Sequence, residues 1–228
     1  NFILGNSIRA IAVFGMMIWL PTYFIRTQGW EAADIGIALG LVSILPSIIG
    51  CVVAGWLTDK LYHQGIHDFS MRFLLVSSVI ALVFTPFVIY IPAMEVKFSL
   101  LVFTGFISAM YSALTPTIMQ LATPNPIRSQ VSAIILFCEN IIGLGGGSTL
   151  VALATNYLYK DDLAVGDSIA LITIVMMSIA SIFFYLALKP FRTQLSLISA
   201  SNPETGHSNP LSAKADILHK PVTISGGE

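Results

Sequence analysis

Six apolar runs, each long enough to cross a lipid bilayer, constrain this chain more than any other feature of its sequence. They cover residues 3–25, 35–57, 72–92, 98–121, 130–154 and 168–188. A helix rises about 1.5 Å per residue, so about 20 apolar residues span the hydrocarbon core. Lipid offers the backbone no hydrogen-bond partners, so we expect every run to be a helix. The sequence therefore predicts an all-α membrane protein, a bundle of six transmembrane helices.

Composition supports this class and argues against others. Hydrophobic residues make up 55% of the 228 residues and charged residues only 10%, whereas a soluble protein carries about 25% charged residues. A net charge of -1 provides no basic surface for nucleic acid. The first run is too long for a signal peptide and lacks its cleavage site. Because the chain starts at Asn1 rather than Met, we expect a fragment or a processed piece of an integral, multi-pass protein.

The distribution of positive charge predicts the orientation. Six spans put both termini on one side, and cytoplasmic loops carry an excess of Lys and Arg. The terminal side carries Lys60, Arg72, Arg128, Lys189 and Arg192, and the opposite side carries Arg26, Lys97 and Lys160. We therefore expect cytoplasmic termini, in a plasma membrane. Residues 193–228 are rich in Ser, Pro, Gly and Asn, which predicts a flexible cytoplasmic tail after a bundle domain of residues 1–192.

Motifs for catalysis and metal binding are missing from the spans. The four histidines lie in predicted loops or in the tail: His63, His67, His207 and His219. No histidine is therefore placed to activate Ser148 as a nucleophile, and neither a His-Glu-x-x-His motif nor a phosphate-binding loop occurs. Both cysteines, Cys51 and Cys138, lie within spans and suggest no disulfide or metal site. We expect no enzymatic activity and no cofactor.

Polar side chains inside the spans are candidate binding residues. Asn6 and Arg9 share a face of the first span, and Glu139 and Asn140 are adjacent in the fifth. The fourth span carries a polar stripe: Thr104, Ser108, Tyr111 and Thr115. Ionisable residues within a membrane are costly and are functional by default. The stripe is explained equally well by interhelical hydrogen bonds and by a cavity wall with Tyr111 as a ligand contact.

Glu139 is the sharpest of these candidates. At 1.5 Å per residue, Arg9 and Glu139 lie at similar depths from the same side of the membrane. We expect Glu139 to pair with Arg9, to bind a substrate cation or to carry a coupling proton. The alternative is a water-exposed carboxylate in an open vestibule.

Small and aromatic residues predict how the first, second and fifth spans are placed. Small residues line one face of the second span (Gly36, Gly40, Ser43, Ser47, Gly50 and Ala54) and recur in the fifth (Gly143, Gly146 and Gly147). Such stripes allow close helix packing, and bending is the alternative for the fifth span. Trp19 and Tyr23 are interpreted as an interfacial aromatic belt. Polarity is thus concentrated in spans one, two, four and five, a transporter-like pattern with spans three and six facing lipid.

Three stretches resemble the major facilitator superfamily. "GWLTDKLYHQG", residues 55–65, matches its signature loop at Gly55, Asp59 and Lys60, without the usual Gly-Arg-Arg/Lys ending. "WLPTYFIRTQGW" and "PNPIRSQVSAIILFCENIIGLGGGSTLVALATNYL" resemble spinster-like members, in which a Pro-x-x-x-Arg turn, here ending at Arg128, precedes a helix with Asn-x-Ile-Gly-x-Gly. Ser148 stands where those relatives usually have Pro, so a helix break there is in doubt.

The resemblance implies a twelve-helix secondary transporter of which this chain is the carboxyl-terminal six-helix half. Substrate would bind between the halves and cross by rocker-switch alternating access. Spinster-like proteins are associated with lysophospholipid and sphingoid-phosphate transport, so the expected substrate is a small amphipathic or anionic solute.

The partners expected from this reading are that solute, membrane lipids and the missing amino-terminal half. The binding candidates are Asn6, Arg9, Thr104, Ser108, Tyr111, Glu139 and Asn140. Gly55, Asp59, Lys60 and Arg128 are the expected gating motif, with Asp59 capping a neighbouring helix. The alternative function is a six-span interaction or assembly subunit that transports nothing.

Overall fold

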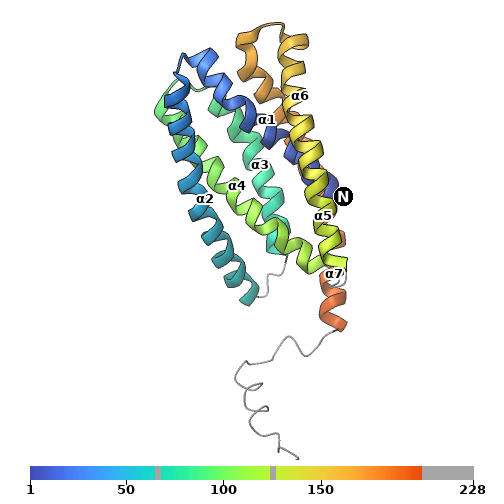
Figure 1. Cartoon of the computed structure of the whole chain (residues 1–228). Helices are drawn as coiled ribbons and strands as arrows, with labels where there is room; N and C mark the ends of the chain where they lie inside the picture. The colour runs from blue at the N-terminus through green and yellow to red at the C-terminus, as the bar shows by residue number, and fades with distance from the viewer. Residues whose placement is uncertain (65–67, 124–126, 202–228) are drawn as a thin grey trace, which may run out of the picture.

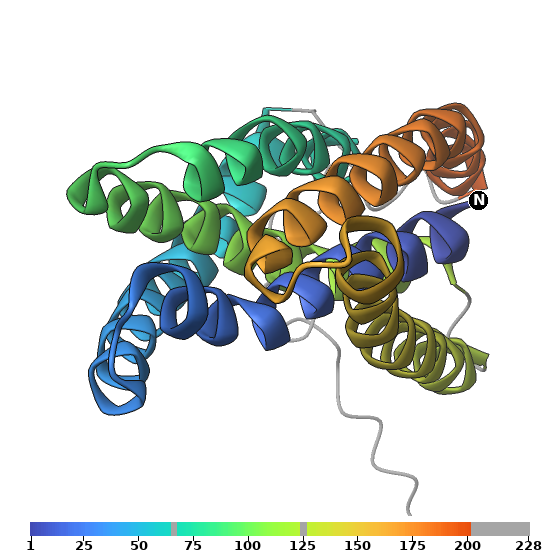
Figure 2. The ribbon, with the colours of Figure 1, turned by 90° about the horizontal axis from the view of Figure 1, so that it is seen from above.

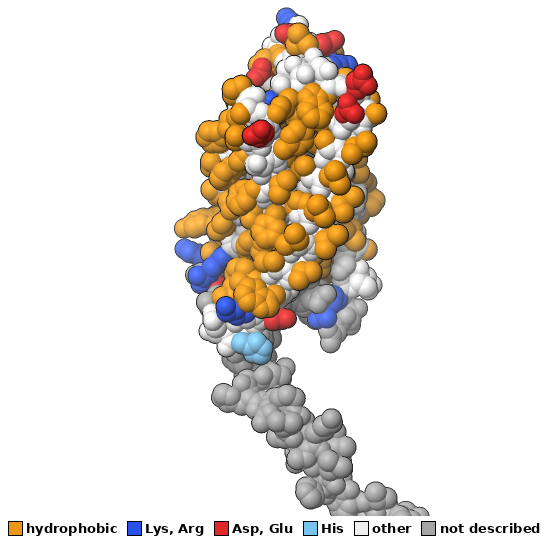
Figure 3. Space-filling model, turned by 90° about the vertical axis from the view of Figure 1, so that its left-hand side faces the viewer, with side chains coloured by type: hydrophobic (Ala, Val, Ile, Leu, Met, Phe, Trp, Pro, Cys, Tyr) orange, Lys and Arg blue, Asp and Glu red, His pale blue; other side chains and the backbone are white. Residues whose placement is uncertain are grey.

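The computed structural model describes residues 1–64, 68–123 and 127–201. Within these ranges, six helices are long and apolar enough to cross a membrane, as the sequence predicts. The helices are tilted against one another in one bundle (Figures 1 and 2). On the face that Figure 3 shows, hydrophobic side chains cover the middle of the bundle and charged side chains gather toward its two ends. This surface fits an integral, multi-pass membrane protein.

The helices extend beyond the predicted apolar runs at most of their ends. The elements are α1 (Phe2–Gln28), α2 (Ala32–His63), α3 (Phe69–Tyr90), α4 (Met94–Ala122), α5 (Arg128–Cys138), η2 (Glu139–Gly145), α6 (Gly146–Leu153), η3 (Ala154–Tyr159), η4 (Asp162–Ala164) and α7 (Val165–Ser201). Together α5, η2, α6 and η3 form the fifth span, and α7 forms most of the sixth. Residues 193–201 of the predicted tail thus continue α7, and residues 202–228 lie outside the described residues.

The fifth span contains two segments with a π-helical hydrogen-bond register. Both η2 and η3 are π-helical segments within an otherwise α-helical rod. Polar side chains bond the backbone carbonyl four residues earlier near these changes: Asn140 to Leu136 at 2.7 Å, and Thr155 to Val151 at 3.0 Å. Ser148 does the same to Leu144 at 2.8 Å. The helix therefore runs through Ser148 unbroken, and its irregularity comes from π turns, which are frequent at functional sites.

Glycines bring the fifth span into backbone contact with α1. A Cβ atom added to Gly147 would lie 2.5 Å from the carbonyl oxygen of Ile11 and 2.7 Å from the amide nitrogen of Gly15. One added to Gly143 would lie 2.7 Å from the Cβ of Ala10. Only glycine permits so close an approach. These glycines serve helix packing, the leading interpretation of the sequence pattern.

The small-residue stripe of α2 is only partly used for packing within the bundle. A Cβ at Gly50 would lie 2.8 Å from the carbonyl oxygen of Phe106 on α4, and Ala54 is fully buried. By contrast, Gly36 and Gly40 have no described atom within 4 Å of the same position. The part of the stripe at Gly36 and Gly40 therefore faces away from the other described residues.

The aromatic residues at the far end of α1 do not form the predicted interfacial belt. Tyr23 is only 2% exposed, and its hydroxyl donates to the carbonyl of Ile89 at 2.8 Å and accepts from Lys97 at 2.6 Å. Trp19 is half-buried and donates to the carbonyl of Ser148 at 3.1 Å. The prediction is wrong because both polar groups find partners inside the protein. Lys97, expected in a loop, lies buried on α4.

Substituting Gly147 by alanine tests the glycine contact. The added methyl group would meet backbone atoms that cannot rotate away, so we expect Gly147→Ala to destabilise the protein by about 1–3 kcal/mol. Gly145→Ala is the matched control, because no described atom lies within 4 Å of that position. Thermal unfolding of the purified protein in detergent measures the effect. Equal unfolding temperatures for both variants would contradict the packing described here.

Candidate substrate-binding site

A buried polar cluster joins α1 to α4. Asn6, Arg9 and Tyr111 are 1%, 6% and 1% exposed. The hydroxyl of Tyr111 donates to Oδ1 of Asn6, and the guanidinium carbon of Arg9 lies 3.4 Å from the centre of the Tyr111 ring. A cation over an aromatic face is stabilised electrostatically, most strongly where water is excluded. The structure thus brings together three of the candidate residues, from two helices far apart in sequence.

The cluster keeps unused hydrogen-bonding capacity. Nε of Arg9 and Nδ2 of Asn6 are buried and have no hydrogen-bond partner within the described part of the chain. Leaving a buried donor unsatisfied costs about 1–3 kcal/mol, and more if it is charged. Two such donors in one cluster are therefore suited to an additional acceptor, either water or a ligand.

Glu139 approaches this cluster from the first residue of η2. Its half-buried carboxylate interacts with the side chain of Asn6 and, electrostatically, with Arg9. The contact with Asn6 falls short of hydrogen-bond geometry, since Nδ2 has no partner by distance and angle. Arg9 and Glu139 do not form a direct ion pair within 4.0 Å. The ion pair that does form among the described residues joins Arg72 to Asp68. Glu139 is thus near Arg9 and still accessible.

The other candidates bond mainly to their own helices. Thr104 donates to the carbonyl of Leu100 at 2.9 Å, and Thr115 to that of Tyr111 at 2.9 Å. Asn140 is exposed and donates to Leu136, whereas Ser108 is half-buried. Tyr111 therefore makes an interhelical hydrogen bond, whereas Thr104 and Thr115 bond within α4. Thr104, Ser108 and Asn140 are not part of the cluster around Arg9.

The signature motif lies on a helix rather than in a loop. Gly55, Asp59 and Lys60 belong to the last turns of α2, and all three are exposed. The ammonium of Lys60 lies 4.8 Å from the ring centre of Trp56. Asp59 sits within α2 itself. Among the described residues its side chain is not seen to cap a neighbouring helix. Arg128 begins α5 and donates to the carbonyl of Thr123 at 3.4 Å. A gating role for these residues stays a prediction.

A second polar connection between α1 and α4 escaped the sequence analysis. Lys97 is 2% exposed and bonds to Tyr23, whose hydroxyl also accepts from Gln28 at 3.2 Å. The sequence placed Lys97 at the edge of a span, where a lysine usually reaches water. Its burial depends on Tyr23, which is distant in sequence. No group of three or more His, Cys, Asp or Glu residues suited to a metal ion occurs in the described ranges.

Comparison with known proteins places this bundle in a family. Residues 2–147 match the family model of the Major Facilitator Superfamily. The chain is 25% identical over 199 residues to an MFS-type efflux pump of Mycolicibacterium smegmatis. The aligned region covers 84% of this chain and 44% of the pump.

Two solved structures of a bacterial homologue of the human lysosomal transporter Spinster have similar folds. Both are inward-facing. The occupied form has a TM-score of 0.68 at 16% identity and the unoccupied form 0.64 at 17%. Each match covers 85% of this chain and 49% or 48% of the homologue. The chain thus spans about half the length of the relatives it matches.

The fold of this chain is that of one six-helix half of a Major Facilitator Superfamily protein. The chain belongs to the Major Facilitator Superfamily, a family of secondary transporters. Both the recognition from the three sequence stretches and the predicted half-transporter fold are confirmed.

Replacing Tyr111 tests the buried cluster. Tyr111→Phe keeps the ring beneath Arg9 but removes the hydroxyl that Asn6 accepts from, so we expect a loss of about 1–3 kcal/mol in stability. Tyr111→Leu also removes the cation–π contact and should cost up to about 2 kcal/mol more. Tyr185→Phe is the control, because Tyr185 is 60% exposed. Thermal unfolding in detergent should rank the variants in this order, and an unfolding temperature of Tyr111→Leu equal to that of the control would refute the cluster.

Proposed function

We propose that this chain is the carboxyl-terminal half of a secondary transporter that moves a small amphipathic or anionic solute by alternating access. The polar head of the solute binds at Asn6, Arg9, Tyr111 and Glu139. The observation that supports this most strongly is the buried Arg9 guanidinium, which has an unused donor and, among the described residues, no direct carboxylate partner. A buried cation of this kind favours an anionic or zwitterionic ligand.

The arrangement of charges suits a head group that carries both signs. Arg9 offers a cation, and Glu139 offers an accessible carboxylate nearby. A phosphate or carboxylate would bind at Arg9, while an ammonium or a coupling proton would be held at Glu139. Similarity to a bacterial homologue of a lysosomal transporter and to an efflux pump supports a transported solute.

The remaining half of the site is proposed to come from a second six-helix half. The matched part of this chain covers only about half of each solved relative, and the open glycines of α2 leave a face that a further helix can cover. Alternating access then moves the two halves around the bound solute. The positive-charge bias supports cytoplasmic termini, and we place the protein in the plasma membrane as part of this proposal. Membership of a transporter family favours transport over the enzyme alternative.

Neutralising Glu139 and Arg9, singly and together, tests the head-group site. We expect Glu139→Gln and Arg9→Gln each to slow transport by the full-length protein roughly tenfold, a change of about 1.4 kcal/mol in the barrier. The double variant should lose less than the sum of the two, because neighbouring charges are coupled. Uptake into proteoliposomes is measured as a function of pH, since a proton carried by Glu139 would make the pH profile flatten in Glu139→Gln.

The control for this set is Glu95→Gln, because Glu95 is an exposed carboxylate in the first turn of α4, outside the cluster. Transport by that variant should match the wild type. If Glu139→Gln left rate, expression and pH profile all unchanged, Glu139 would have no part in transport.

Separating the halves distinguishes a transporter from an assembly subunit. A site between two halves lacks one wall when one half is absent, so vesicles with residues 1–228 alone should show no saturable uptake. Co-expression of the other half should restore it. Saturable uptake by residues 1–228 alone would contradict the two-half proposal, and failure of uptake with both halves would favour the assembly subunit.

A further inference from the structure

Two helices of the bundle, α1 and α4, carry the same pair of polar residues at the same spacing. In α1, Arg9 is followed fourteen residues later by Tyr23, and in α4, Lys97 is followed fourteen residues later by Tyr111. Fourteen residues make about four helical turns, so the cation and the tyrosine lie on one side of the helix, about 21 Å apart. Each helix therefore has a cation toward its start and a tyrosine toward its end.

The structure pairs these four residues crosswise. The guanidinium of Arg9 on α1 lies over the ring of Tyr111 on α4, and the ammonium of Lys97 on α4 donates to the hydroxyl of Tyr23 on α1 at 2.6 Å. We call the end of the bundle where α1 begins the near end, and the end where α1 finishes the far end. A half of this family consists of two inverted three-helix repeats, which makes α1 and α4 equivalent. Exchange of the repeats therefore converts the near pair, Arg9–Tyr111, into the far pair, Lys97–Tyr23.

The far pair is closed in this structure. Lys97 and Tyr23 are each 2% exposed. The hydroxyl of Tyr23 also donates to the carbonyl of Ile89 and accepts from Gln28, which uses its donor and both acceptor positions. A Cβ atom added to Gly166 of α7 would lie 2.8 Å from the ring of Tyr23. The far ends of α1 and α4 are thus bonded to each other and covered by α7.

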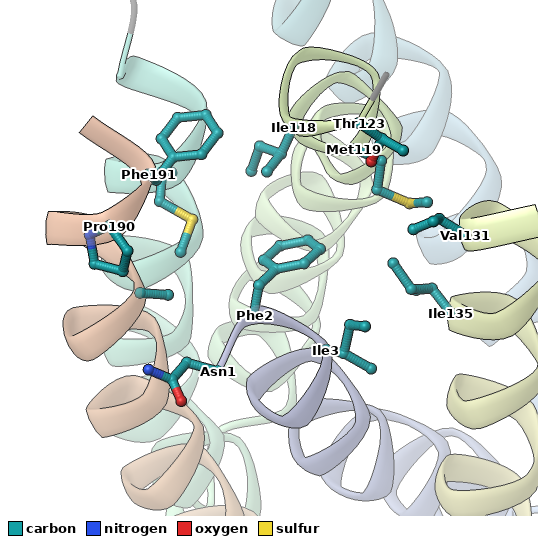
Figure 4. Close-up of a pocket in the computed structure, with 12 residues that line it drawn as sticks. Asn1, Phe2, Ile3, Ile118, Met119, Thr123, Val131, Ile135, Pro190 and Phe191 are labelled. Carbon is teal, nitrogen blue, oxygen red and sulfur yellow. The ribbon is translucent and has the colours of Figure 1, made fainter. Parts of the chain in front are cut away.

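The near pair is more open. Nε of Arg9 and Nδ2 of Asn6 are buried without a hydrogen-bond partner in the described part of the chain. About two helical turns beyond the pair, a cavity of about 480 Å³ separates the ends of the two helices. Phe2 of α1 and both Ile118 and Met119 of α4 are among its lining residues (Figure 4). One end of the α1–α4 contact is therefore fastened while the other has room to close.

We propose that Lys97 and Tyr23 form a latch between α1 and α4, which is closed in this state and opens when the transporter releases solute at the far end. The inference rests on the proposed function, because alternating access requires one state open at each end. Exchange of the repeats converts the observed state into its opposite, in which the near end is fastened and the far end is open. Lys97 and Tyr23 are thus positioning residues that select the open end.

The chemistry of the far pair suits a contact that has to break. Among the described residues, no carboxylate oxygen lies within 4.0 Å of the Lys97 ammonium, whose partner is the neutral hydroxyl of Tyr23. A hydrogen bond with one charged partner is weaker than a charge-assisted ion pair with two. The latch therefore holds the far end without making its opening prohibitive, and water can solvate the ammonium once that end is open.

Distances between spin labels test the latch in the full-length protein in proteoliposomes, without added solute. One label pair reports the far end, at Ile25 of α1 and Val96 of α4, which are 40% and 42% exposed. The second pair reports the near end, at Leu4 of α1 and Ser112 of α4, both exposed. Each pair is introduced as cysteines after the native cysteines are replaced by serine. Pulsed electron paramagnetic resonance then measures the distance distribution at each end.

Removing the bond between Lys97 and Tyr23 should open the far end. We expect Lys97→Met to raise the ratio of separated to close far-end distances roughly tenfold, which corresponds to about 1.4 kcal/mol. The near-end labels should approach each other at the same time. Tyr23→Phe keeps the ring but removes the same bond, so it should act alike and serves if Lys97→Met does not fold. Lys160→Met, at an exposed lysine after the fifth span, is the matched control and should leave both distributions unchanged.

The inference is overturned if the far-end variants lower the unfolding temperature but keep the wild-type distances, because the contact is then only structural. Separation at the far end with no approach at the near end would also overturn it, since this is local fraying. Octylphosphocholine uptake distinguishes this inference from the proposed function. Reciprocal distance changes without uptake by the wild type would retain the latch and refute the proposed function. Uptake that depends on Arg9, with distances that ignore Lys97→Met and Tyr23→Phe, would refute the latch alone.

Discussion

The contact between α1 and the fifth span at Gly15 and Gly147 determines the geometry of the site. Their backbones approach so closely that a single methyl group at Gly147 has no room. Gly143, one turn away, packs on Ala10, the neighbour of Arg9, and lies four residues from Glu139. Glycine packing therefore sets the distance between the guanidinium and the carboxylate. Polar side chains in lipid contribute little to association by themselves, so backbone packing has to come first.

The sequence predicts the spans and the main polar positions because both follow from simple periodicity. Length and hydropathy define six helices, and similar depths from one side of the membrane already relate Arg9 to Glu139. The pairing of Arg9 with the ring of Tyr111 could not be predicted, since it depends on how α1 and α4 are rotated. The same limit explains Tyr23 and Lys97. Each looks interfacial within its own span, and only their contact, together with the carbonyl of Ile89, accounts for their burial.

The π-helical segments are a further feature that periodicity does not predict. A π turn is one residue longer than the α turn it replaces, so it rotates everything beyond it and alters which residues share a face. In the fifth span, Glu139 begins the first such segment and Asn140 bonds a carbonyl near the change of register. The two adjacent candidates face different surroundings, because Glu139 turns toward Asn6 while Asn140 stays exposed. Adjacent residues on a helix point in different directions.

The packing within this half follows the inverted repeat that its family implies. Each half of such a transporter consists of two three-helix repeats, so α1, α2 and α3 correspond to the fourth, fifth and sixth spans. By this correspondence, the contact between α1 and the fifth span is equivalent to the contact between α4 and α2. Both contacts are extensive in this bundle.

Each of these two equivalent contacts contains a glycine without room for a Cβ atom: Gly147 against α1 and Gly50 against α4. Small-residue stripes therefore occur on the second and fifth spans for one reason. The first helices of the two repeats, α1 and α4, face each other, and their backbones stay apart. That gap is bridged by Arg9 and Tyr111 near one end and by Tyr23 and Lys97 near the other. Side chains can exchange partners where packed backbones cannot, so the polar residues lie where the fold leaves freedom for binding.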